Sequence, residues 1–125
     1  MTITNERFKI QSKKNPMWYG LRLWIAQLLK KDVPRNSVIT SAYVQEYVLK
    51  TKEPQKGGWN HLTLSELMDL MMGETTELLE AITIYQTTPN MKNAIHVFTE
   101  IADVQNYGMM MQDNMMENPH GERGK

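Results

Sequence analysis

Two pairs of acidic residues on either side of a proline-containing turn limit what this chain can fold into. Glu74 and Glu77 form the first pair, and Glu100 and Asp103 form the second. The turn Thr87-Thr88-Pro89-Asn90 lies midway between them, and both flanking stretches have helical periodicity. If the chain folds into an antiparallel hairpin at this turn, each member of the first pair comes level with a member of the second. The i, i+3 spacing puts both members of a pair on one helix face, so four carboxylates can meet in one layer.

Glu74 lies in the middle of an apolar helix face, which is an unusual place for a carboxylate. On a helical wheel, six other side chains fall within roughly 60° of it: Leu67, Leu70, Met71, Leu78, Ala81 and Tyr85. A charge placed there costs several kcal/mol unless it is paired or binds a metal. No Lys or Arg lies within one turn of Glu74 in the sequence. We therefore expect a metal site.

The stretch after the turn has two contrasting faces. One is apolar, and we expect it to pack into the core: Ala94, Val97, Phe98, Ile101, Val104, Gly108 and Met115. The other is mostly polar: Lys92, His96, Thr99, Glu100, Asp103, Asn106, Tyr107, Met110 and Asn114. Such a face alone is usually exposed to solvent. Opposite the apolar stripe around Glu74, we expect it to form the wall of a polar cavity.

The other elements predict an all-α protein, an antiparallel helical bundle. Residues 17–31 form an apolar helix that begins at Asn15-Pro16, is too short to span a bilayer and is expected to be buried between neighbours. Residues 38–51 fit either an alternating strand or a helix, and we favour a helix because the rest of the chain is helical. Residues 52–58, with Pro54 and two glycines, predict a loop.

The long helix at 62–85 has a clear start signal, because Thr63 and Glu66 predict a capping box. We expect three segments: a flexible arm at 1–14, one helical domain at 15–116 and a polar tail at 117–125.

Composition excludes several classes of protein. The 125 residues suffice for one domain, and 14 basic and 14 acidic residues give a net charge of zero, which favours neither a nucleic acid nor a membrane as partner. No cysteine is present, so disulfides and thiolate metal sites are excluded. No signal peptide or spanning segment is expected, and a cytoplasmic location fits. Eleven methionines suggest adaptable packing at a subunit interface, so we expect self-association.

The motif Glu74-x-x-Glu77, then 22 residues, then Glu100-x-x-Asp103 resembles the signature of the all-α nucleoside triphosphate pyrophosphatases. This superfamily includes the MazG-like proteins and the dimeric dUTPases and dCTPases. The resemblance implies a MazG-like, oligomeric bundle, a homodimer or homotetramer. It implies that the four acids bind Mg²⁺, or Mn²⁺ in its place. Water would then cleave a nucleoside triphosphate between its α- and β-phosphates, giving a monophosphate and pyrophosphate.

The resemblance also suggests where substrate binds. Trp59 and His61 lie where dCTPase-like members carry an aromatic residue and a histidine near the base. Tyr107 matches a base-stacking tyrosine, and Asn106 could read a base edge. The chain ends soon after the second motif, where family members continue into a phosphate-binding helix. Lys92 is therefore a candidate for the phosphates, as are Lys13 and Lys14.

The sequence also bears on two other interpretations. One is a catalytically inactive helical interaction protein that retains the bundle. The other, a ferritin-like di-iron bundle, needs Glu-x-x-His motifs, which neither acidic pair forms.

Overall fold

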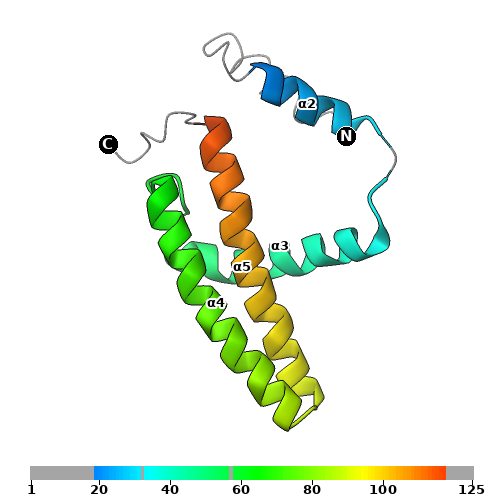
Figure 1. Cartoon of the computed structure of the whole chain (residues 1–125), viewed down its shortest axis with the longest axis vertical. Coiled ribbons are helices and arrows are strands. Elements are labelled where there is room, and N and C mark those ends of the chain that lie inside the picture. The colour runs from blue at the N-terminus through cyan, green and yellow to red at the C-terminus, as the bar shows by residue number, and fades with distance from the viewer. Residues whose placement is uncertain (1–18, 32, 57, 118–125) are drawn as a thin grey trace.

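The fold is built on a long helical hairpin crossed by a third helix. The structure is a computed structural model that describes residues 19–31, 33–56 and 58–117, and these residues contain helices and no strand. The helices are α2 (Tyr19–Leu29), α3 (Asn36–Lys56), α4 (Leu64–Thr87) and α5 (Met91–Glu117). Helices α4 and α5 run antiparallel along each other, and α3 crosses α5 (Figure 1). The predicted all-α class and the hairpin at Pro89 are confirmed.

Local hydrogen bonds fix the start of α4 and the bend between α4 and α5. At the start of α4, the Glu66 amide donates to Thr63 Oγ1 at 3.1 Å, and the Thr63 amide donates to Glu66 Oε1 at 3.0 Å. This is the predicted capping box. At the bend, Asn90 Oδ1 accepts from the Asn93 amide at 2.8 Å and so caps the start of α5.

The mostly polar face of α5 is its buried face. The most buried residues of the helix are Ala102, Asp103, Asn106, Tyr107 and Asn114. The expectation that the opposite, apolar face packs into the core is wrong for Phe98, which is 56% exposed, and for Ile101 and Met115, which are also at the surface. The physical reason is that α4 packs along the polar face and the C-terminal half of α3 crosses it, whereas Phe98 and Ile101 line only a groove beside Val44 of α3.

The ambiguous segment before the glycine pair is helical, as favoured, but the helix is longer than predicted. It continues to Lys56, so the loop predicted at 52–58 is wrong over most of its length. Pro54 falls in the final turn, where its missing N–H removes one hydrogen bond and leaves the preceding turns intact. This extension carries Lys52 on a helix instead of a loop.

Helix α2 lies by the C-terminal end of α5 (Figure 1), where buried Arg22 donates to the Met116 carbonyl. Most of its large apolar side chains are exposed, with Trp24 at 57%, while Leu21 and Ile25 are half-buried, so the predicted burial between neighbours is wrong for most of the helix. The start at Asn15-Pro16, the arm at 1–14 with Lys13 and Lys14, and the tail from residue 118 lie outside the described residues. None of the described helices combines the length and hydropathy needed to cross a bilayer.

Candidate functional site

Three carboxylates from the two arms of the hairpin converge in one cluster. Glu74 and Glu77 on α4 and Glu100 on α5 each offer an oxygen, and these oxygens all lie within 4.8 Å of one another. Glu74 Oε2 and Glu100 Oε2 are buried and have no hydrogen-bond partner among the described residues. An all-carboxylate set with unsatisfied oxygens suits a hard divalent cation. The cluster could therefore hold a metal ion.

The electrostatics of the cluster show how crowded its negative charges are. Burial raises the pKa of Glu74 to about 7, helped by a hydrogen bond with Glu77 and by the charges of Asp103 and Glu77, while Lys52 opposes the shift. Burial, followed by the same two charges, also raises the pKa of Glu100. The fold thus holds carboxylates together against their repulsion, which a bound cation would relieve.

Asp103, the fourth predicted acid, lies beside the cluster but has a different partner. Its Oδ2 is 2.6 Å from Nζ of Lys52, and its side chain is only 6% exposed. Burial lowers the pKa of Lys52, but the carboxylates of Asp103, Glu74 and Glu100 raise it above its ordinary value. A cation therefore lies beside the acidic layer, although no Lys or Arg lies within one turn of Glu74 in the sequence. Lys52 is far from Asp103 in the sequence, and only the crossing of α3 over α5 brings the two side chains together.

A signal for Lys52 exists in the sequence once the helix is extended. Val44, Val48 and Lys52 are spaced i, i+4, so they share one face of α3. Val48 is 3% exposed and packs against the hairpin. Because the loop is predicted to begin at residue 52, the predicted helix ends before Lys52 and leaves it out of this pattern.

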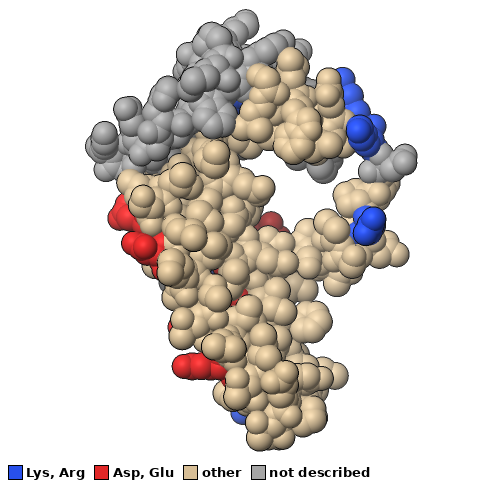
Figure 2. Space-filling view, in the orientation of Figure 1, with Lys and Arg blue, Asp and Glu red and all other residues tan. Residues whose placement is uncertain are grey.

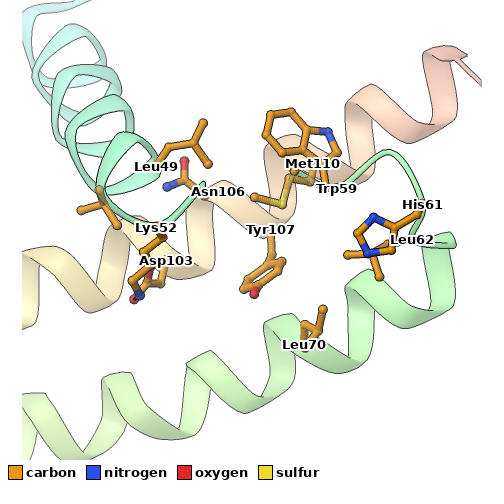
Figure 3. Close-up of a pocket in the computed structure, with 12 residues that line it drawn as sticks. Leu49, Lys52, Trp59, His61, Leu62, Leu70, Asp103, Asn106, Tyr107 and Met110 are labelled. Carbon is orange, nitrogen blue, oxygen red and sulfur yellow. Dashed lines mark hydrogen bonds and ion pairs between the residues drawn. The ribbon is translucent and has the colours of Figure 1, made fainter. Parts of the chain in front are cut away.

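A cavity of about 260 Å³ opens next to Asp103, between α3, α5 and the segment leading into α4. Its walls include four of the five predicted substrate-binding residues: Trp59, His61, Asn106 and Tyr107. Lys52 and Asp103 lie at one end, His61 and Leu62 at the other, and Tyr107 between them (Figure 3). The walls are mainly apolar and aromatic with a few polar groups, which is the usual composition of a small-molecule site.

Hydrogen bonds hold the cavity walls in place. Trp59 Nε1 donates to Asp113 Oδ2 at 3.1 Å, tying the segment before α4 to α5. Gly58, which lines the cavity beside it, has φ of 81°, a conformation that favours glycine. Asn106 accepts from Gln45 Nε2 at 3.3 Å and donates to the Gln45 carbonyl at 3.1 Å. Its amide therefore joins α3 to α5.

Lys92, the fifth predicted substrate-binding residue, does not line this cavity. It is exposed in the first turn of α5, near the bend of the hairpin, whereas the cavity begins at Asp103 further along the helix.

No family model, no curated protein and no solved structure matches this chain.

Proposed function

We propose that this protein is a metal-dependent nucleoside triphosphate pyrophosphohydrolase. The observation that carries the proposal is the position of a three-carboxylate cluster next to a cavity with aromatic walls, joined to it by Asp103. The first feature suits a cation with phosphates, and the second suits a base with its sugar. The resemblance of the two acidic motifs to the MazG-like and dCTPase-like pyrophosphatases supports the same conclusion.

Each group of residues has a role in this proposal. Glu74, Glu77 and Glu100 would hold Mg²⁺ or Mn²⁺, with Asp103 as a fourth acid at the cavity edge. When bound, such a cation neutralises phosphate charge and lowers the pKa of a coordinated water. The rings of Trp59 and Tyr107, the imidazole of His61 and the amide of Asn106 would contact the base, and all four residues line the cavity. Lys92, the candidate for the phosphates, does not line it.

We also propose that the protein self-associates, as a homodimer or homotetramer, and acts in the cytoplasm. Large apolar side chains of α3, α4 and α5 are exposed in the single chain. Figure 2 shows a wide surface with few charged side chains over α5 and the adjoining part of α4, while Asp and Glu lie along the outer edge of α4 and Lys and Arg lie near the end of α2 and the start of α3. A surface of this kind usually contacts another protein.

The same surface supports the second candidate, an inactive helical protein that binds partners through exposed apolar faces. One assay separates the two. Purified protein is incubated with Mg²⁺ and a panel of deoxynucleoside and nucleoside triphosphates, and the release of pyrophosphate and monophosphate is measured. Turnover that EDTA abolishes supports the enzyme. Its absence with every triphosphate, under both Mg²⁺ and Mn²⁺, contradicts it.

A further inference from the structure

Lys52 lies between the carboxylate cluster and the cavity. Its Nζ contacts Asp103 at 2.6 Å, and it lines the cavity together with Trp59 and Tyr107. Its side chain is 41% exposed although Asp103 is 6% exposed. Apart from His61, Lys52 is the only basic side chain among the described residues that line the cavity.

The contact with Asp103 is partly screened by water, because the Lys52 side chain is 41% exposed. The Asp103 carboxylate is 6% exposed and needs a partner for its charge. The buried side chain of Val48 and the two hydrogen bonds between Asn106 and Gln45 already fix α3 on α5.

Electrostatics give Lys52 a different role. The charges of Asp103, Glu74 and Glu100 act on Lys52, so it is a counter-ion to these carboxylates, alongside His96, whose Nε2 is 3.5 Å from Glu100 Oε1. An ammonium group has three donors, and Asp103 accounts for one of them. When a divalent cation binds the acids, the attraction between Lys52 and Asp103 weakens, and the long flexible side chain can turn its charge toward the cavity.

We propose that Lys52 binds the polyphosphate of the substrate, exchanging Asp103 for a non-bridging phosphate oxygen when metal and nucleotide are bound. This inference rests on the proposed function and deepens it, because it assigns the phosphate contact that the motifs leave open. It replaces Lys92, which is remote from the cavity, in that role. Lys52 then discriminates by phosphate charge, favouring triphosphates over monophosphates.

The test compares Lys52→Gln with Lys52→Arg and with Lys50→Gln. Lys50 lies on the same helix, is exposed and does not line the cavity, so its substitution removes the same charge elsewhere. Calorimetry measures binding of Mg²⁺ alone, of inorganic tripolyphosphate and inorganic phosphate with Mg²⁺, and of the α,β-imido analogues of the four common deoxynucleoside triphosphates with Mg²⁺. Melting curves accompany each variant.

We expect Lys52→Gln to weaken binding of tripolyphosphate and of the preferred imido analogue by roughly tenfold or more, the usual value of a charge-assisted hydrogen bond. Its affinity for Mg²⁺ alone should be unchanged or higher, since a competing cation is gone. Lys52→Arg should retain most of the binding, and Lys50→Gln all of it.

Three outcomes overturn the inference, and they are distinguishable. If the wild type binds the analogues with Mg²⁺ and Lys52→Gln binds them equally well, Lys52 has no phosphate role and the proposed function stands. If Lys52→Gln loses Mg²⁺ binding or melts at a much lower temperature, Lys52 has only a structural role. If the wild type binds none of the analogues, the proposed function fails and this inference fails with it.

Discussion

Nζ of Lys52 on α3 lies 2.6 Å from Oδ2 of Asp103 on α5. This contact joins the cluster of Glu74, Glu77 and Glu100 to the cavity, because Asp103 borders both. One ammonium group against four carboxylates leaves an excess of negative charge. The site is thus suited to bind a further cation, and substitution of its charged residues can test this.

The first prediction concerns Glu74. Glu74→Gln should lower turnover by roughly 100-fold or more, because a metal ligand stabilises the transition state by several kcal/mol. In EDTA it should melt at the same or a higher temperature than the wild type, since it removes a charge from a crowded site. Glu80→Gln, at an exposed position on the same helix, is the control. A variant as active as the wild type would remove the cluster from the mechanism.

The second prediction concerns pH. The pKa of Glu74 is about 7 in the fold against an ordinary 4.5. Between these values the folded, metal-free protein keeps a proton that the unfolded chain has lost. The contribution of Glu74 to the free energy of unfolding is therefore largest below pH 4.5 and declines as pH rises toward 7.

Metal binding should follow the opposite trend. Affinity for Mg²⁺ should increase from pH 6 to pH 8, with release of protons, because the cation binds the ionised carboxylates. Calorimetry in two buffers with different ionisation enthalpies measures this release. The same affinity and no proton release across the range would show that Glu74 is not among the ligands.

The third prediction concerns Trp59. Trp59→Ala should raise KM for the preferred triphosphate by about tenfold, since stacking on a base is worth roughly 1–3 kcal/mol. Trp59→Phe keeps a ring and loses only the hydrogen bond to Asp113, so its KM should change less. Steady-state kinetics provide the comparison. Trp24→Ala, at an exposed position on α2, serves as the control. Equal KM values for all three variants would argue for a purely structural tryptophan.

The fourth prediction concerns Asn106, which is 4% exposed. Asn106→Ala should lower the free energy of unfolding by about 1–3 kcal/mol, because it removes two hydrogen bonds to Gln45 and leaves that residue's groups without this partner. Denaturant melts measure the change. The predicted base-reading role requires a different result, in which stability is retained and only the preference among bases changes.

The fifth prediction concerns self-association through the groove between α3 and α5. Phe98 and Ile101 line this groove together with Val44, and both are exposed. The wild type should be a dimer or tetramer in light scattering at micromolar concentration, and Phe98→Glu should shift it toward monomer. Val33→Glu changes a side chain that is 80% exposed before α3 and should leave the assembly intact. A monomeric wild type would contradict the prediction.

The sequence by itself determined the local features of this protein. The capping box at Thr63 and Glu66, the bend at Pro89 and the helical character of α4 and α5 all follow from short-range hydrogen bonding and periodicity. The two acidic pairs lie at equal distances from the bend, and this correctly predicted that Glu74, Glu77 and Glu100 come together. Two antiparallel helices joined by a short turn can pair in few registers, so the distance from the bend decides which residues lie opposite each other.

Only the tertiary structure decided what the third helix contributes. The position of α3 across α5 gives Asp103 its partner Lys52, ties Asn106 to Gln45 and closes the cavity. Together with α4, it also buries the mostly polar face of α5 and leaves Phe98 exposed. Periodicity favoured the apolar face, because a polar face is buried only where other elements supply partners for its polar groups. The choice depends on contacts between residues far apart in the chain, which no local pattern encodes.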